Sequence, residues 1–257
     1  MNPRHQAIIS EVCRRGYASH EDLARLSGVA VQTIRRDVRT LADAGLLIRH
    51  HGGAAAPSSV ENIDYYDRKI LDRSKKEAIG ACAAAAIPDG ASLFVNIGTT
   101  TEAFARALSG HARLRVITNN LHVASVLARD PECRVVVAGG TVRVRDGGIL
   151  GPAALEVLEG YRADYGVVGI SGIDEDGTLL DFDADEVRCA RTIMRNSRHV
   201  FLLADHTKFS RRPLVRAGHI SQVSAFFTDR PPPLPVREIL EKSGVALHIA
   251  PDVRKRT

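Results

Sequence analysis

The 257-residue sequence lacks the features that mark several classes of protein. It has no tryptophan, 5% aromatic residues and only four cysteines, Cys13, Cys82, Cys133 and Cys189, which stand far apart. No CxxC pair or cysteine–histidine ligand spacing occurs, so we expect no disulfide framework and no metal site, and interpret the cysteines as buried free thiols. No apolar run approaches the ~18 residues that a membrane span requires. Residues 1–16 mix charged with apolar residues and contain no signal-peptide core, so the sequence predicts a cytoplasmic protein without a membrane partner.

Motifs of three common enzyme classes are missing as well. The sequence contains no GxxxxGK(S/T) phosphate loop, no GxGxxG following a strand and no GxSxG nucleophile elbow. Their absence argues against nucleotide hydrolysis, dinucleotide binding and α/β-hydrolase chemistry.

What the sequence does contain is positive charge concentrated near its N-terminus. Residues 1–56 hold eight arginines, no lysine and five acidic residues, so they carry +3 of the total charge of +5. The other 201 residues are nearly neutral for their length. The length allows one large domain or two smaller ones, and the basic segment allows a nucleic-acid partner.

The basic segment also has the apolar periodicity of three short helices. Ser19 is suited to cap the second helix, and Ser27-Gly28-Val29 forms a tight turn into a third helix over 30–44. We predict a strand at 46–49 and a hairpin tip at 50–53. Residues 1–56 therefore read as a winged helix-turn-helix domain, with the helix-turn-helix at about 20–39 and the wing at about 46–54. The predicted apolar positions are Ile8, Ile9, Val12, Cys13, Leu23, Leu26, Ile34, Val38, Leu41 and Leu46.

The third helix is the candidate recognition helix. Ile34, Val38 and Leu41 turn one face to the core, and the other face carries side chains that suit base edges in the major groove. Arg49, His50 and His51 are candidate wing contacts to phosphate or the minor groove. The alternatives are a solvated basic helix face and, for the histidine pair, a metal site, although no third ligand stands nearby. The candidate base-contacting residues are Gln32, Thr33, Arg35, Arg36 and Arg39.

Residues 57–73 have the composition of a linker, and 74–257 alternate short apolar runs with amphipathic helices. This alternation predicts an α/β domain with a largely parallel sheet, in which ligands bind beyond the carboxyl ends of the strands. The expected strands are 92–97, 114–118, 134–138, 165–170, 199–203, 225–228 and 247–249, and the expected helices are 102–108, 121–129 and 186–196.

A candidate anion site follows the first of these strands. Gly98 permits a tight turn, and Thr99, Thr100 and Thr101 offer hydroxyl groups at the N-terminus of the next helix. The alternative is a capping box between Thr99 and Glu102, which needs only those two residues. Loops at 118–120, 138–141 and 169–172 follow other strands in the same style, which suggests a shared crevice.

Two charged groups further along remain open to two interpretations. Lys208, in the Asp205–Phe209 loop after a strand, neutralises a phosphate or is simply solvent-exposed. The acidic group of Asp181, Asp183, Asp185 and Glu186 accepts hydrogen bonds from sugar hydroxyls or only favours the dipole of the following helix.

Taken together, these motifs resemble those of the DeoR-type bacterial repressors over nearly the whole chain. The resemblance implies a winged helix-turn-helix fused to a sensor domain similar to ribose-5-phosphate isomerase, which binds a phosphorylated sugar or polyol and thereby releases operator DNA. Residues 145–151 and 169–174 most resemble those of family members that respond to glycerol 3-phosphate, so the resemblance implies glycerol 3-phosphate as the effector. By position, the resemblance implies effector contacts from Gly98, Thr99, Thr100, Thr101, Asn119, Asn120, Gly139, Gly140, Ser171, Asp205 and Lys208. The motifs that carry it are 32–37, 49–54, 67–69, 97–100, 118–121, 138–140, 169–174 and 205–209.

The chain departs from this family pattern at two positions. Ala30 replaces the serine that often caps the recognition helix, which removes ~1 kcal/mol of capping. Asn96 replaces an acidic residue, which removes a negative charge near the phosphate.

The rival interpretation is a sugar-phosphate isomerase-like enzyme fused to a DNA-binding segment. Isomerisation requires a general base and an acid, which the Gly169–Gly172 loop does not provide and for which Glu186 and Lys208 are the remaining candidates. We expect a repressor with no catalytic residue and no cofactor, bound to double-stranded operator DNA as a homodimer or tetramer.

Overall fold

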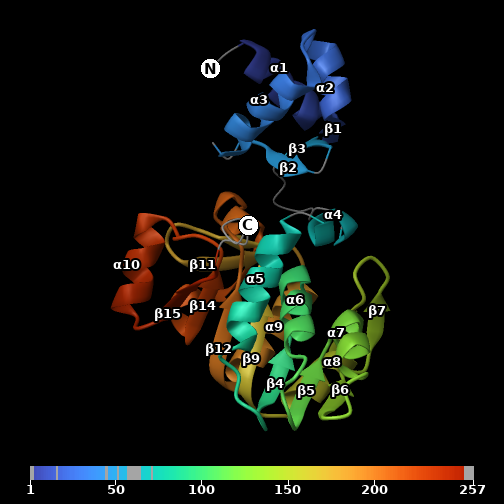
Figure 1. Cartoon of the computed structure of the whole chain (residues 1–257), viewed down its shortest axis with the longest axis vertical. Helices are drawn as coiled ribbons and strands as arrows, with labels where there is room; N and C mark the ends of the chain where they lie inside the picture. The colour runs from blue at the N-terminus through green and yellow to red at the C-terminus, as the bar shows by residue number, and fades with distance from the viewer. Residues whose placement is uncertain are drawn as a thin grey trace. The chain divides into compact units, whose positions relative to one another are not determined.

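The computed structural model describes residues 3–15, 17–43, 46–50, 52–56, 65–70 and 72–251. Contacts between residues divide the chain into two compact units, Met1–Leu71 and Asp72–Thr257 (Figure 1). No helix among the described residues is long and apolar enough to cross a membrane.

The first unit is a winged helix-turn-helix. Its helices are α1 (Pro3–Arg15), α2 (His20–Ser27) and α3 (Val31–Asp43), and its sheet has the antiparallel order β1-β3-β2. The strands are β1 (Tyr17–Ser19), β2 (Ile48–His50) and β3 (Gly53–Ala55). A further short helix, α4 (Tyr65–Ile70), lies within the predicted linker. The predicted three helices and wing are confirmed, and β1 was not predicted.

Most of the predicted apolar positions form the core of this unit. Ile8, Val12, Leu23, Ile34 and Val38 are completely buried, and each such aliphatic side chain contributes ~1.5–3 kcal/mol by leaving water. The predictions for two leucines were wrong, because Leu26 is 53% exposed and Leu46 is 41% exposed. Each adjoins a turn at the end of its helix or strand, where the periodicity no longer decides which way a side chain points. Leu47 and Ala54 are buried instead.

The turns around α2 follow the sequence closely. The Ser19 hydroxyl accepts a hydrogen bond from the amide of Asp22 at 3.0 Å, which confirms it as the cap of α2. Gly28 ends this helix with a φ of 63°, a conformation that favours glycine. At the start of α3, the carbonyl of Ala30 accepts from the amides of Thr33 and Ile34, and the methyl side chain of Ala30 has no group that could cap the helix.

The second unit is built on a seven-stranded parallel sheet, which confirms the predicted α/β class. Its order is β15-β14-β12-β9-β4-β5-β6. The chain moves outward from β4 through β5 to β6, then returns to place β9 on the other side of β4 and moves outward in the opposite direction. The strands are β4 (Ser92–Val95), β5 (Leu114–Thr118), β6 (Cys133–Val137), β9 (Ala163–Gly169), β12 (Ser197–Leu203), β14 (Ala225–Thr228) and β15 (Ala246–Ile249).

Helices cover both faces of this sheet. Alternate residues of each strand enter opposite core clusters: Leu93 and Val95 pack under α5, α6 and α7, whereas Phe94 packs under α8, α9 and α10. Figure 1 shows α5 and α6 in front of the sheet and α9 behind it. The helices are α5 (Arg73–Ala84), α6 (Thr99–Ala107), α7 (Leu121–Leu127), α8 (Pro152–Glu159), α9 (Ala184–Arg195) and α10 (Leu234–Lys242).

Smaller elements surround the carboxyl ends of the strands and were not predicted. They are a hairpin of β7 (Thr141–Arg143) and β8 (Gly148–Leu150), an antiparallel sheet of β10 (Gly172–Ile173), β11 (Thr178–Asp181) and β13 (Val215–His219), and the 3₁₀ turns η1 (His206–Ser210) and η2 (Ile220–Gln222).

The cysteines are consistent with the interpretation as free thiols where the structure describes them. Cys189 is completely buried, and this burial raises the pKa of its thiol to about 11. Cys82 and Cys133 are half-buried. The side chain of Cys13 lies outside the described residues.

Candidate functional site

The outer face of α3 presents the predicted base-contacting side chains together. Gln32 and all three arginines are exposed, and Thr33 is half-buried. These five side chains line one surface groove of about 510 Å³. The helix turns its apolar residues inward, so the groove is lined by guanidinium and amide groups that can donate hydrogen bonds to guanine and adenine.

Asp37 lies on the inner side of the same helix and fixes α3 against α1. Its carboxylate accepts hydrogen bonds from Arg4 Nε at 2.6 Å and Arg4 Nη2 at 3.2 Å, and lies 3.1 Å from His5 Nε2. The hydrogen bond from Arg4 is the main reason that the pKa of Asp37 lies below its ordinary value. The carboxylate therefore holds the recognition helix against α1 and does not contact DNA.

From the interaction of Asp37 with Arg4 and His5 we predict that the stability of the first unit depends on pH. Because the pKa of Asp37 is lowered on folding, its stabilising effect is complete above the unfolded pKa of about 3.9 and is lost as the pH falls through the folded value. We expect Asp37→Asn to lower the unfolding free energy by about 1–3 kcal/mol at neutral pH. The unfolding free energy of this variant should also fall less than that of the unmodified protein as the pH is lowered to acid values. Chemical denaturation across pH 2–7 measures both, with the exposed Asp43→Asn as control; an unchanged fall at acid pH in Asp37→Asn would contradict the assignment.

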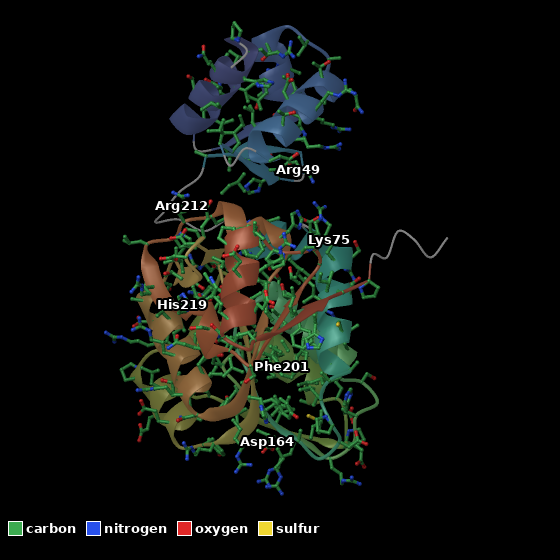
Figure 2. The ribbon with its side chains drawn as sticks, turned by 90° about the vertical axis from the view of Figure 1, so that its left-hand side faces the viewer. Arg49, Lys75, Asp164, Phe201, Arg212 and His219 are labelled. Atoms are coloured by element: carbon green, nitrogen blue, oxygen red, sulfur yellow. The ribbon has the colours of Figure 1, made fainter. Side chains whose placement is uncertain are left out.

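The predicted wing contacts are placed differently from one another. Arg49 is exposed on β2 (Figure 2). The chain turns between His50, which ends β2, and Gly53, which begins β3 and pairs with His50, so the hairpin tip lies at 50–53 as predicted. The His50 ring is buried and meets Tyr17 edge to face at 5.6 Å, which keeps it away from the surface that a phosphate reaches. His51 lies outside the described residues.

In the second unit, the predicted loops meet at one edge of the sheet. All seven strands are parallel, but the direction in which the chain adds strands to the sheet reverses between β4 and β9. Open parallel sheets bind ligands at such a switch point. Loops with predicted contacts follow β12, β9, β4, β5 and β6, which are five adjacent strands. Figure 2 shows Lys75 and Arg212 towards this end of the unit and Asp164 at the opposite end, with Phe201 between them.

The loop after β4 forms the N-terminus of α6. Gly98 caps the helix with a φ of 150°, and a Cβ there would lie 3.2 Å from Thr101 Oγ1, so only glycine fits without strain. Thr99 is the first helical residue and no side chain caps the helix, which excludes the capping box between Thr99 and Glu102. The first amides of a helix have no intrahelical acceptors and therefore suit an anion.

The three threonines of this turn have different surroundings. Thr101 is completely buried, and its hydroxyl lies 2.8 Å from the carbonyl oxygens of Asn96 and Gly98, where it closes the loop. Thr99 and Thr100 are buried at the start of the helix without an equivalent bond to this loop. The geometry therefore favours Thr99 and Thr100 as ligand contacts and gives Thr101 a structural role.

The remaining predicted contacts fall into two groups. Asn119 and Ser171 lie buried at the ends of β5 and β9, beside the loop after β4. Asn120 instead caps α7, since its Oδ1 accepts from the amide of His122 at 2.9 Å. Gly139 and Gly140 are exposed after the edge strand β6, and a Cβ on Gly140 would lie 2.8 Å from the Leu150 carbonyl. Their placement supports turn roles for Asn120 and Gly140.

Asp205, at the end of β12, lies among three cations. Burial alone raises its pKa, but Lys208, Lys76, the Thr207 hydroxyl and Arg211 together hold the pKa well below its ordinary value. Lys76 and Arg211 are each only 4% exposed. The cluster therefore places three cationic side chains around one buried carboxylate, and cationic groups also favour the binding of an anion.

Sequence analysis missed Lys76 and Arg211. Lys76 stands with Ile79, Gly80 and Ala83 on the buried face of α5, so a lysine within an apolar stripe was the available signal. Gly80 lets α5 pack directly on α6, because a Cβ there would lie 2.6 Å from the Phe104 amide nitrogen. Arg211 lies in a loop and gave no comparable signal.

The acidic group before α9 has a structural partner. Asp183 caps α9 and also accepts from Arg143 Nη1 at 2.7 Å, and Glu186 accepts from Arg143 Nη2 at 2.7 Å. The same guanidinium binds Asp146 through two hydrogen bonds of 2.8 and 2.7 Å. These contacts favour the helix-dipole interpretation over contacts to sugar hydroxyls.

Three potential metal ligands also come together near Asp205. Ligand atoms of Asp72, Asp205 and His206 lie within 4.8 Å of one another. Lys75 already pairs with Asp72 at 2.6 Å, and Asp229 holds His206 Nδ1 at 2.8 Å. Because Lys76, Lys208 and Arg211 surround Asp205 as well, the charge here favours an anion over a metal cation.

The fold and the basic helix define a winged-helix DNA-binding protein with an appended α/β domain. The chain belongs to the DeoR family: residues 4–60 match the DeoR-like helix-turn-helix domain, and residues 72–230 match the DeoR C-terminal sensor domain. As a member of this family, the chain is a DNA-binding transcriptional repressor.

Individual relatives agree with this assignment. The glycerol-3-phosphate regulon repressor of Escherichia coli K12 is 49% identical over 96% of this chain and 98% of its own length. Its namesake from Haemophilus influenzae is 50% identical over 88% of each chain. Among solved structures, ribose 5-phosphate isomerase A of Neisseria gonorrhoeae aligns with 52% of each chain at a TM-score of 0.39 and 15% identity.

Proposed function

We propose that the second unit binds a phosphorylated sugar or polyol, and that this binding releases the first unit from operator DNA. The observation that carries the proposal is the cationic cluster of the buried Lys76 and Arg211 and the half-buried Lys208, at the same sheet edge as the N-terminus of α6. Buried cations and unpaired helix amides together suit a phosphate group. The uncharged Asn119 and Ser171 nearby suit hydroxyl groups.

On DNA, α3 enters the major groove and Arg49 contacts the backbone from the wing. Repression then depends on a difference in effector affinity between the DNA-binding and released states, since a ligand that binds both equally shifts nothing. Operators with two half-sites require at least two copies of the chain. We place this protein in the bacterial cytoplasm and, when bound to DNA, at the nucleoid.

For the effector we propose glycerol 3-phosphate. The E. coli and H. influenzae relatives are named for the glycerol-3-phosphate regulon and match most of this chain. The absence of a cofactor is part of the same proposal, because phosphate recognition here needs only side chains and helix amides.

An enzymatic role has little support in the geometry. Glu186, the candidate base, is held by Arg143 at 2.7 Å, and Lys208 faces Asp205. Glu186 is therefore committed to an ion pair, Lys208 alone does not supply both a base and an acid, and the relatives are repressors.

A panel of small phosphates tests the function. We expect glycerol 3-phosphate to raise the melting temperature of the full chain, by an amount equivalent to ~2.7 kcal/mol at 100 times its Kd, and to release operator DNA. Glycerol and inorganic phosphate are the matched halves of the ligand and should do neither at the same concentration. Stabilisation by a different sugar phosphate alone would overturn the effector, and stabilisation by none of the panel would overturn the sensor.

A further inference from the structure

A second groove lies away from the strand-end site, on the α9 side of the sheet. It measures about 690 Å³ and runs along the outer face of α9 between α8 and β13. Leu155, Met194 and Ala217 supply apolar lining, and the rest consists of Gly218, the polar Thr192 and Gln222, the acidic Glu159 and several basic residues. These basic residues are arginines on successive turns of α9, Arg188, Arg191 and Arg195.

The contacts of these arginines leave the groove positively charged. Arg191 donates to the backbone carbonyls of Ala217 at 3.1 Å and Arg216 at 2.7 Å, and no carboxylate among the residues that the structure describes pairs with it. Arg188 lies 3.7 Å from Asp185, and Arg195 lies 4.0 Å from Glu159. Both of these pairs are exposed and long, so they neutralise little. A partner for this groove needs acidic groups together with an apolar side chain.

The chain itself carries such a surface on α10. Val236 and Leu240 turn inward to the core, so residues at i, i+4 and i+7 starting from Leu234 turn outward. This outward ridge consists of Leu234, which is 60% exposed, and the exposed Glu238 and Glu241. The pair of Glu238 with Lys242 is 3.6 Å long and solvent-exposed, so it can be exchanged for another cation at small cost.

The ridge and the groove lie on the same side of the second unit. Helices α8, α9 and α10 and the turn η2 all contribute to one core cluster, on one face of the sheet. α10 packs against η2, and Gln222 of η2 lines the groove. The side of Figure 1 that carries α10 faces the viewer in Figure 2. In a symmetric pair of copies in which each ridge meets the groove of the other copy, both contacts are used and the assembly closes at two copies.

We propose that this surface joins two copies of the chain, with the α10 ridge of each copy seated in the arginine groove of the other. Leu234 packs on the apolar lining at Leu155 and Met194, and Glu238 and Glu241 pair with Arg188, Arg191 and Arg195. Two arginine grooves repel one another, so contact of α9 with α9 alone does not provide such an interface. The proposal is independent of the effector that the second unit binds.

A charge-swap experiment on the full chain tests the pairing. The groove variant is Arg188→Glu with Arg195→Glu, and the ridge variant is Glu238→Arg with Glu241→Arg. In each variant alone both contacts become like-charged, so we expect the dissociation constant of this interface to rise about 100-fold and the assembly mass to halve in sedimentation velocity. In an equimolar mixture both contacts are again of opposite charge, so the mass should return to that of the unmodified protein.

The control carries two charge reversals on the other side of the sheet, Arg106→Glu with Arg129→Glu, and should assemble like the unmodified protein. Circular dichroism melts establish that each variant folds, and recovery in the mixture itself requires folded partners. The proposal is overturned if the unmodified chain is a monomer at micromolar concentration, or if the groove and ridge variants assemble normally. It is also overturned if the mixture does not recover, an outcome that assigns the groove to an acidic peptide or an organic polyanion.

Discussion

Arg35→Ala is expected to weaken operator binding about 10- to 100-fold and to leave effector binding unchanged. Arg35 lies near the middle of the exposed face of α3, and a bidentate contact from arginine to guanine contributes ~1–3 kcal/mol of discrimination. The effector site belongs to the other unit, so its affinity should not change. Fluorescence anisotropy with operator and random duplexes measures the first effect, and a ligand-induced thermal shift measures the second.

The two duplexes also distinguish a base contact from a phosphate contact. Loss of a base contact reduces the ratio of operator to random affinity, whereas loss of a phosphate contact weakens both duplexes and lowers the salt slope by about one. Arg106→Ala, an exposed arginine of α6, is the charge-matched control and should bind operator normally. If Arg35→Ala bound operator as tightly as the unmodified protein, α3 would not be the recognition helix.

Lys208→Ala is expected to reduce effector affinity about 10- to 100-fold and to leave operator binding intact. Lys208 follows β12 and lies close enough to Asp205 to lower the pKa of that carboxyl group. A charge-assisted bond to phosphate contributes ~1.5–3 kcal/mol, and Lys76 and Arg211 remain to offset Asp205 after the substitution. The measurement is the effector concentration that releases half of the bound operator.

A neighbouring cation provides the control for this prediction. Arg212 stands four residues along, its side chain is 82% exposed, and its contact with Asp174 is 3.9 Å long (Figure 2). Arg212→Ala removes the same charge from the same loop and should respond to effector normally. Loss of operator binding in Lys208→Ala would contradict the division of roles between the two units, and an unchanged effector response would remove Lys208 from the site.

The helix-turn-helix could be predicted because its determinants are local. Ile34, Val38 and Leu41 recur at helical spacing, so the positions of Arg35, Arg36 and Arg39 on the opposite face follow from geometry alone. The prediction that His50 contacts DNA was wrong, because the burial of its ring depends on a contact that is not local in sequence. The ring of His50 packs on Tyr17, a residue 33 positions earlier in the chain, and the local sequence of the hairpin does not indicate this contact.

The strand-end loops could also be predicted, since each short apolar run ends in glycine, threonine or asparagine. Their spatial grouping depends on the strand order, which places β9 beside β4 although β5 and β6 come between them in the sequence. Lys76 and Arg143 escaped prediction because they have partners distant in sequence: Lys76 acts on Asp205, and Arg143 binds Glu186 across 43 residues. Arg211 is close to Asp205 in sequence, but it lies in a loop where no periodicity singles it out.

The sequence by itself therefore determined the class of each unit, the basic face of α3 and the loops from which a ligand site is built. These features depend on the periods of helix and strand and on the residues that tight turns permit, and both are local. The tertiary structure decided which loops share an edge, which cations surround Asp205, and that the ridge of α10 and the groove of α9 face the same side. Those relations arise from packing between segments far apart in the chain, where burial and charge pairing select the partners and local periodicity carries no information.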